Sequence, residues 1–179
     1  MVNIRKATPD DIESVISLFK ELIDEIKNHE YTPEWEYGIY PTDDDIIKPI
    51  ESGELYVGEI ESEIVSTIVI DHKPNEGYNN IKWNINTTDE NIFYVHLVAV
   101  KQSYCNKGIA KEMLNYVFDK AKKQSIKSIR LNVVKNNLPA ENLYKKLSFE
   151  YIDSIEIFIK NRGLKFFKVF EKIIRYSTH

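Results

Sequence analysis

The stretch Val98-Ala-Val-Lys-Gln-Ser-Tyr-Cys-Asn-Lys-Gly-Ile-Ala110 contains the change of sequence pattern that decides the fold. Residues 93–100 are β-branched, aromatic and nearly continuous, which predicts a buried strand. Residues 101–107 are turn-like, and Gly108 precedes a helical pattern whose apolar side chains share one face. A strand, a loop and a helix that follow one another this closely are typical of a crossover in an α/β domain.

Hydrophobic periodicity predicts the elements on both sides of this stretch. The strands are expected at 2–7, 54–60, 63–70, 93–100, 126–134, 149–159 and 166–174, and a further extended piece is expected at 78–85. The helices are expected at 12–26, near 43–51, from 109 onward and at 137–147. The two-residue link Glu61-Ser62 predicts a hairpin. This order predicts one α/β (α+β) domain over residues 1–179, with a mixed sheet.

The composition is that of a globular protein without a disulfide framework or a dedicated metal site. The chain has 179 residues, of which 42% are hydrophobic and 29% charged. It has one cysteine, Cys105, and four scattered histidines, His29, His72, His96 and His179. No apolar run approaches the roughly 20 residues of a membrane span, and the first residues do not resemble a signal peptide. We therefore expect a cytoplasmic protein with no metal and no membrane partner.

The net charge of -4 is the sum of two opposite regions. Residues 1–60 contain 5 Lys/Arg and 15 Asp/Glu, whereas residues 101–149 contain 11 Lys/Arg and 3 Asp/Glu. This asymmetry predicts an anion-binding region and a separate cation-binding region. The alternative is a pair of solvated helix faces of opposite sign.

The loop before the helix has features of an anion site. Amide N–H groups at a helix start are unpaired and lie at the positive end of the helix dipole, so they can bind phosphate oxygens. Gly108 and Ala110 lack bulk, and Lys107 and Lys111 add positive charge. The loop has neither the Gly-Lys-Ser/Thr ending of a P-loop nor three spaced glycines. By itself this is a weak pattern, and an ordinary loop is the alternative.

A second motif follows downstream, in Asn137-Leu-Pro-Ala-Glu-Asn-Leu-Tyr-Lys-Lys-Leu-Ser-Phe149. Together with the strand and the loop, it resembles the GNAT superfamily of acetyl-CoA-dependent N-acetyltransferases. Residues 35–41 and 81–83 also resemble a bacterial branch of that superfamily whose substrates are mostly unassigned. That family's loop pattern Gln/Arg-x-x-Gly-x-Gly/Ala falls on residues 105–110, and its Asn-x-x-Ala, Tyr and Gly-Phe pattern falls on the second motif. Cys105 replaces the usual Gln or Arg, Asn106 a frequent Gly, and Ser148 the usual Gly.

The resemblance implies a mixed, mostly antiparallel, twisted sheet flanked by helices, with the cofactor in a cleft beside the central strand. It also implies direct transfer of acetyl from acetyl-CoA to a primary amine of a small molecule or peptide. The implied cofactor-binding residues are Val98, Ala99, Val100, Cys105, Asn106, Lys107, Gly108, Ile109, Ala110, Lys111, Asn137 and Tyr144. For Asn137, a role as helix cap is an alternative or an addition.

Two residues are candidates for proton transfer. Tyr144 matches the family's general acid for the departing thiolate; a buried tyrosine with a satisfied hydroxyl is the alternative. His96 is the candidate base because histidine titrates near neutral pH. Strand periodicity is expected to place Tyr94, His96, Val98 and Val100 on one face. A structural histidine with a water relay as base is the alternative to His96.

The acidic and aromatic segment at residues 29–45 is the region where relatives bind the acceptor. The candidate acceptor contacts are Trp35, Glu36 and Tyr37, together with Tyr94 on the central strand. Aromatic faces and carboxylates suit a cationic amine. The alternative is that these aromatic side chains fill the core while the acids face water.

The sequence also bears on two alternative functions and on the oligomeric state. A non-catalytic acyl-CoA-binding or sensor domain of the same fold is the alternative function. A nucleic-acid-binding module is disfavoured, because no such motif is present and the acidic N-terminal third would repel phosphates. Both a monomer and a homodimer are compatible with the sequence.

Overall fold

The computed structural model describes residues 1–176, so His179 lies outside the described residues. Contacts divide the chain into two compact units. Unit 1 comprises residues 1–70 and 96–116, and unit 2 comprises residues 71–95 and the described residues from 117 onward. The central strand and the third helix each contribute residues to both units.

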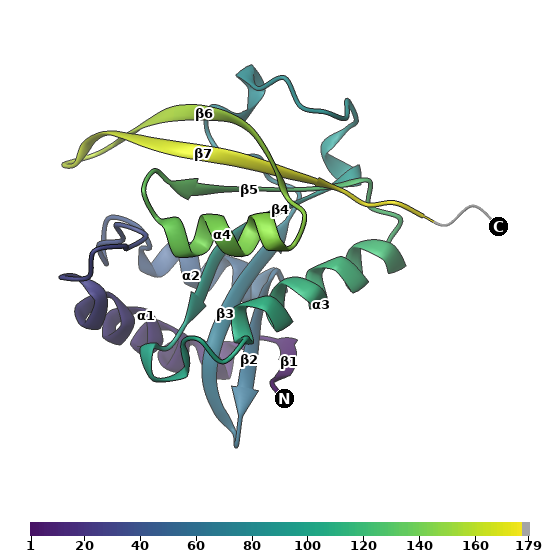
Figure 1. The fold of residues 1–179 in the computed structure, drawn as a ribbon. Coiled ribbons are helices and arrows are strands. Elements are labelled where there is room, and N and C mark those ends of the chain that lie inside the picture. The colour runs from purple at the N-terminus through teal and green to yellow at the C-terminus, as the bar shows by residue number, and fades with distance from the viewer. Residues whose placement is uncertain (177–179) are drawn as a thin grey trace. The chain divides into compact units, whose positions relative to one another are not determined.

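The described residues form seven strands and four α-helices (Figure 1). The strands are β1 (Asn3–Lys6), β2 (Leu55–Ile60), β3 (Glu63–Asp71), β4 (Ile92–Val100), β5 (Ser128–Val134), β6 (Glu150–Ile159) and β7 (Gly163–Ile173). The helices are α1 (Ile12–Ile26), α2 (Asp43–Glu51), α3 (Ile109–Lys123) and α4 (Leu138–Lys146). The strand order is β1-β2-β3-β4-β5-β7-β6, with β4 and β5 parallel and most other pairs antiparallel. The expected mixed, mostly antiparallel sheet is confirmed.

The core of unit 1 lies between α1, α2 and the strands of that unit. The apolar stripe of α1 buries Val15, Leu18, Phe19 and Leu22, because positions three and four apart lie on one helix face. These side chains share one cluster with residues of α2, β2, β3 and β4: Ile46, Ile50, Leu55, Val57, Ile64, Val69, Leu97 and Ala99. The periodicity of residues 12–26 therefore predicted both the helix and its buried face.

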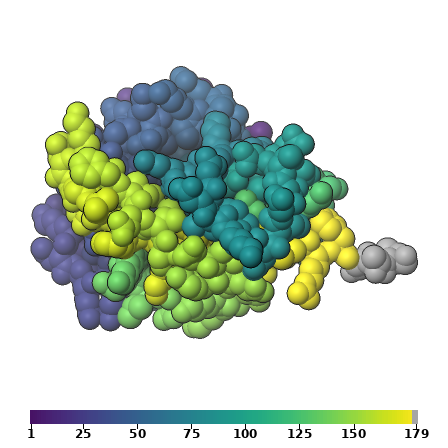
Figure 2. Space-filling view, turned by 90° about the horizontal axis from the view of Figure 1, so that it is seen from above, coloured from purple at the N-terminus to yellow at the C-terminus, as the bar shows by residue number. Residues whose placement is uncertain are grey.

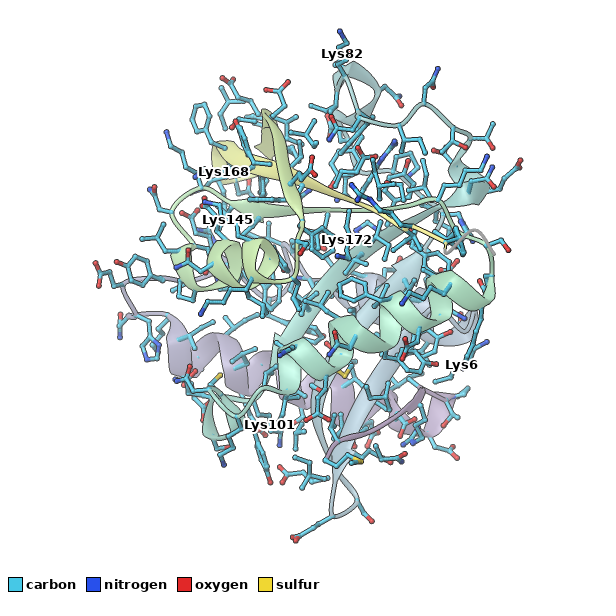
Figure 3. The ribbon with its side chains drawn as sticks, turned by 45° about the vertical axis from the view of Figure 1, so that its right-hand side comes forward. Lys6, Lys82, Lys101, Lys145, Lys168 and Lys172 are labelled. Carbon is cyan, nitrogen blue, oxygen red and sulfur yellow. The ribbon has the colours of Figure 1, made fainter. Side chains whose placement is uncertain are left out.

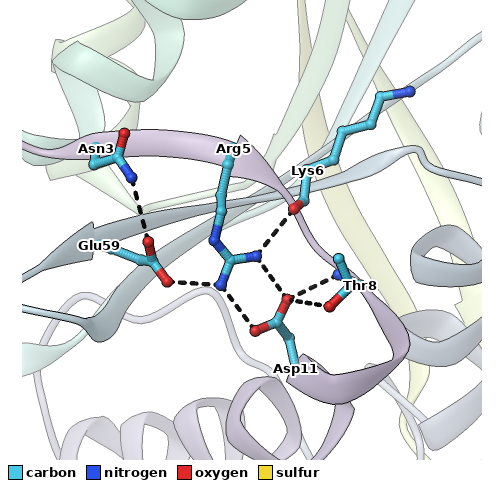
Figure 4. Close-up of polar contacts among 6 residues, drawn as sticks. All are labelled: Asn3, Arg5, Lys6, Thr8, Asp11 and Glu59. Atoms are coloured by element: carbon cyan, nitrogen blue, oxygen red, sulfur yellow. Dashed lines mark hydrogen bonds and ion pairs between the residues drawn. The ribbon is translucent and has the colours of Figure 1, made fainter.

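Side-chain hydrogen bonds fix the 3-10 turn Pro9–Asp11 that leads into α1, and the start of α2. The Asp11 carboxylate accepts from the Thr8 amide and hydroxyl, at 2.8 and 3.1 Å, and it also accepts from Arg5 (Figure 4). Thr42 precedes α2, and its hydroxyl accepts from the Asp45 amide while the Asp45 carboxylate accepts from the Thr42 amide. This reciprocal capping satisfies amides that the helix itself leaves unpaired.

The hairpin between β2 and β3 turns at Glu61-Ser62, as predicted. Both residues have positive φ, of 51° and 67°, which matches the right-handed twist of the two strands. Leu97 in β4 also has a positive φ, of 49°. The expectation that residues 94–100 alternate without interruption is therefore wrong at Leu97, because a left-handed residue breaks the two-residue period of a strand.

Unit 2 contains β5, β6 and β7 and the long connection at residues 72–91. The extended piece expected at 78–85 is wrong: residues Tyr78–Asn80 form a single 3-10 turn, and the remainder is irregular. Side chains hold this connection in place. The Arg130 guanidinium donates to the Ile85 carbonyl at 2.8 Å, and the Asn84 amide donates to the Glu171 carboxylate at 2.8 Å. Figure 2 shows the connection, in teal, at the surface beside the strands β6 and β7 in yellow-green.

Candidate active site

The loop between β4 and α3 presents a row of free amides in unit 1. A 3-10 turn at Gln102–Tyr104 is followed by Asn106 and Gly108, with positive φ of 61° and 79°. The amides of residues 106–111 donate no hydrogen bond to any part of the chain that the structure describes. A β-carbon built at Gly108 would have no neighbour within 4 Å, so the space beside it is open. Alternating backbone conformations of this kind form an anion-binding concavity, to which the N-terminus of α3 adds its dipole.

One carboxylate of β3 holds the start of this loop. Glu63 accepts from the Lys101 ammonium at 2.7 Å and from the Tyr104 hydroxyl at 2.9 Å. These two hydrogen bonds hold the pKa of Glu63 below its usual range. Sequence reasoning missed Glu63, because the contact joins residues about 40 positions apart and no local pattern announces it.

The remaining side chains of the loop differ in exposure. Asn106, Lys107 and Lys111 are exposed, and the Lys107 ammonium lies 4.9 Å from the centre of the Tyr104 ring. Ile109 is buried beneath the loop. The Cys105 thiol is directed at the carbonyl oxygens of Val100 and Lys101, at 3.9 and 3.6 Å, and burial raises its pKa. The Cys105 thiol therefore contacts carbonyl oxygens of its own turn, and its raised pKa means that it is not an activated thiolate.

The part of β4 before the loop is paired on one side within unit 1. The Lys101 amide donates to the Val65 carbonyl at 2.8 Å, and the Thr67 hydroxyl donates to the Leu97 carbonyl at 3.0 Å. The parallel pairs of β4 with β5 end at Tyr94. His96, Val98 and Val100 are half-buried, whereas Ala99 is buried in the core of unit 1.

In unit 2, α4 carries the two residues of the second motif. Asn137 occupies the N-cap position, but its side chain makes no capping hydrogen bond, so the expected capping role is wrong. Tyr144 is 6% exposed, and its ring packs against Phe149 and Phe170, with ring centroids 5.8 and 6.1 Å away. Burial raises the pKa of Tyr144 to about 12. Its hydroxyl has no hydrogen-bond partner among residues 1–176.

The predicted acceptor contacts lie in both units. In unit 1, Trp35 packs edge-on against Phe19, the Tyr37 hydroxyl donates to Asp43, and Glu36 is exposed. In unit 2, Tyr94 is 2% exposed, and its hydroxyl donates to Asp89 at 2.7 Å. This burial favours a core role for Tyr94.

No group of three or more His, Cys, Asp and Glu side chains among residues 1–176 is arranged to hold a metal ion. No helix in that part of the chain has the length and apolar character needed to cross a bilayer.

The seven-stranded mixed sheet with its helices defines the fold as one of the α/β class. Residues 20–149 match the model of the Acetyltransferase (GNAT) family, so the chain belongs to this family. No curated protein sequence matches the chain.

Solved structures show the same fold over the whole chain. A Staphylococcus aureus Mu50 protein assigned as an acetyltransferase has 26% identity and a TM-score of 0.72, with 96% of this chain and 99% of that chain covered. A GNAT-family acetyltransferase from Streptococcus agalactiae 2603 has 21% identity and a TM-score of 0.80, with 98% and 96% covered. The ribosomal-protein-S18-alanine N-acetyltransferase of Escherichia coli has 13% identity and a TM-score of 0.69, with 100% and 97% covered.

Proposed function

We propose that the protein transfers an acetyl group from acetyl-CoA to a primary amine of a small molecule or a peptide. The observation that carries this proposal is the row of free amides at residues 106–111, in a chain of the GNAT family. Six successive N–H groups without partners are costly unless water or a ligand accepts from them. Phosphate oxygens fit this donor set, and the open space beside Gly108 admits them.

The chain's own groups would each have one task when the cofactor is bound. Acetyl-CoA supplies an acetyl group activated as a thioester. The amides of residues 106–111, with the side chains of Lys107 and Lys111, would hold its phosphates, whereas the Cys105 amide already donates to the Gln102 carbonyl. The half-buried Asn137 side chain, which makes no capping hydrogen bond, would bind the cofactor arm. The backbone of Val98 and Val100, beyond the end of the pairing with β5, would bind the arm like an added strand.

Two side chains would handle protons. The Tyr144 phenol is protonated at neutral pH, so it would donate its proton to the departing sulfur. We expect Tyr144→Phe to lower kcat at least tenfold, with acetyl-CoA affinity retained. His96, half-buried on β4, would accept the proton of the amine, directly or through water. Replacing it by Gln should remove the acidic limb of the pH–rate profile; an unchanged profile would exclude His96 as base.

The acceptor would be cationic, because the segment at residues 29–45 carries exposed carboxylates and aromatic rings. Tyr31 and Tyr40 are 39% and 38% exposed, and Glu36 is exposed beside them. Such a surface favours an ammonium by charge pairing and by contact with aromatic faces. Trp35 and Tyr37 would support this surface through their contacts with Phe19 of α1 and Asp43 of α2.

The direct test is to measure CoA release from acetyl-CoA with a panel of polyamines, amino-acid amides, aminoglycosides and short peptides. We expect turnover with at least one cationic amine, and loss of that turnover in Tyr144→Phe. A preference for anionic acceptors would refute the cationic part of the proposal. Tight acetyl-CoA binding without transfer to any amine would instead support a non-catalytic acyl-CoA-binding or sensor protein of the same fold.

A further inference from the structure

The helix that carries Tyr144 needs support from outside itself. α4 has nine residues, and a helix of this length is marginal in water on its own. The hydroxyl of Tyr144 has no hydrogen-bond partner in the described chain, so no polar contact of its own fixes its position. The position of this hydroxyl therefore depends on how α4 is attached to the sheet of unit 2.

A lysine of β7 holds the N-terminal half of α4. The Lys168 ammonium donates to both carboxylate oxygens of Glu141, at 2.9 Å each, and Lys145 donates to one of them at 2.7 Å. Glu141 is 5% exposed, and the two ammonium groups hold its pKa below its usual range. A buried carboxylate needs such partners, because losing them leaves a desolvated charge.

A second lysine of β7 holds the C-terminal end of the same helix. The Lys172 ammonium donates to the carbonyl of Leu147 at 2.7 Å and lies 4.9 Å from the centre of the Phe118 ring. Leu147 is the residue that ends α4, and carbonyls at a helix C-terminus are unpaired and carry partial negative charge. Burial lowers the pKa of Lys172.

The two lysines lie on one face of β7, on either side of an aromatic side chain. Lys168, Phe170 and Lys172 are spaced by two, so their side chains leave the strand on the same side. Phe170 is fully buried, and its ring centroid lies 6.1 Å from that of Tyr144. Figure 3 shows Lys168 near one end of α4 and Lys172 near the other. Tyr144 thus packs on the strand between the two ammonium contacts.

We propose that Lys168 and Lys172 are positioning residues that fix α4 on β7 and thereby set where the hydroxyl of Tyr144 lies. This role rests on the proposed function, in which Tyr144 is the general acid. Neither lysine belongs to the sequence motif of α4, and both act on the reaction only through the tyrosine.

The first experiment measures Tyr144 itself and needs no activity. Tyrosine rings labelled with ¹³C are observed by NMR at neutral pH, where the lysines are charged, in the parent, in Lys168→Met and in Lys172→Met, with Tyr144→Phe to assign the signal. The Tyr144 ring signal should move toward the chemical shift of an exposed tyrosine in both Met variants, because a loosened helix exposes a ring that is 6% exposed in the parent. Lys160→Met, at an exposed position on the hairpin between β6 and β7, is the matched control and should leave it unchanged.

Conservative variants guard against loss of the fold. Lys172→Gln keeps an N–H donor for the Leu147 carbonyl, and Lys168→Arg keeps a cation for Glu141, so both should restore most of the parent chemical shift. A Tyr144 ring signal that stays at the parent position in folded Lys168→Met and Lys172→Met would overturn the proposal. Should either Met variant not fold, Lys168→Gln and Lys172→Ala replace them with the same expectation.

The second experiment tests the link to catalysis by a double-mutant cycle. Lys172→Met should lower kcat about tenfold in the parent and have no further effect in the Tyr144→Phe background, because both changes remove the same proton donor. Equal losses in the two backgrounds would show a general structural effect and overturn the positioning role. If the parent transfers acetyl to no amine, the proposed function fails, while the NMR comparison at neutral pH still decides whether the lysines position Tyr144.

Discussion

In each unit of the molecule, one arginine donates hydrogen bonds to carboxylates, but the two arginine side chains differ in how far they are buried. In unit 1, Arg5 donates to Asp11 at 2.7 and 2.9 Å and to Glu59 at 2.6 Å, and its side chain is 35% exposed (Figure 4). In unit 2, Arg130 donates to Glu171 at 3.0 Å, and their side chains are only 5% and 0% exposed. Water can therefore replace part of the contacts of Arg5, whereas it cannot reach the contact between Arg130 and Glu171.

The functional groups of the two units differ in the same way. The proposed anion site of unit 1 consists of backbone amides on an exposed loop, held by the contact of Lys101 with Glu63, a carboxylate whose side chain is 46% exposed. The proposed proton donor of unit 2 is a buried side chain, on a helix held through Glu141, a carboxylate whose side chain is 6% exposed. Unit 1 should therefore respond mainly to changes of backbone conformation, and unit 2 mainly to the loss of single buried partners.

The largest effect on stability is expected from Glu171→Gln. The Glu171 carboxylate accepts from Ser128, Arg130 and the Asn84 amide, and the substitution leaves the buried Arg130 without its counter-charge. Breaking a buried ion pair in this way costs about 3–5 kcal/mol, and the free energy of unfolding from urea denaturation should fall by that amount.

The matched control removes both charges. The double variant Arg130→Met, Glu171→Leu should recover most of the loss, because apolar residues of similar volume avoid the desolvated charge. A loss below about 1 kcal/mol in Glu171→Gln would mean that the pair behaves as an exposed one, and the contrast between the units would be wrong.

Gly108→Val is expected to have the next largest effect, on acetyl-CoA binding. Gly108 has a φ of 79°, which a β-branched residue adopts only with strain of about 1–3 kcal/mol. The loop should leave the conformation that presents the amides, and the dissociation constant for CoA, measured by calorimetry, should rise up to about 100-fold.

Gly163→Val provides the comparison for this prediction. Gly163 has a similar φ of 73° and open space around it, but it lies in the hairpin between β6 and β7. The substitution should lower stability by a similar amount and leave CoA affinity unchanged. Equal CoA affinity in the parent and in Gly108→Val would show that the loop does not hold the cofactor.

Local sequence patterns were sufficient for the elements whose contacts are local. The apolar stripe of α1, the threonine that caps α2 and the two-residue turn at Glu61-Ser62 each depend on neighbours within a few positions. The free-amide loop could also be predicted, because a glycine between a strand and a helix leaves amides unpaired wherever the chain folds around it.

Features that depend on distant partners could not be predicted. Residues 78–85 alternate as a strand does, but the connection is fixed by Arg130 and Glu171, which are 45 and 87 positions from their partners in it. The positive φ of Leu97 interrupts β4 within an unbroken apolar run, where no residue type marks it. Lys168 and Lys172 resemble ordinary surface lysines in the sequence, and only the pairing of β7 with its neighbours places them beside α4.

Acid titration should reveal the exposed arginine site of unit 1. Arg5 lowers the pKa of Asp11 to about 2 from 3.8, so the unfolded chain binds a proton more readily than the folded one. The stability from this pair is fully present above about pH 4 and is lost as pH falls toward 2. Because Arg5 is 35% exposed, we expect about 1–2 kcal/mol.

The measurement compares the pH dependence of unfolding in Asp11→Asn and in the parent. The variant should lose this stability at neutral pH and show a flatter curve between pH 4 and 2. Asp10→Asn, at the exposed neighbouring position, should behave as the parent does. Identical slopes for the parent and Asp11→Asn would show that Arg5 does not stabilise the Asp11 carboxylate.

The smallest effect is expected from Cys105→Gln, which restores a residue that is usual in the family. The Cys105 thiol is directed at the Val100 and Lys101 carbonyls and away from the free amides that follow it. A glutamine can add at most about one hydrogen bond to the ligand, worth about 0.5–1.5 kcal/mol, so CoA affinity should rise by no more than about tenfold. A gain of about 100-fold, measured under the same conditions as for Gly108→Val, would assign to a side chain the binding that we attribute to the backbone of this loop.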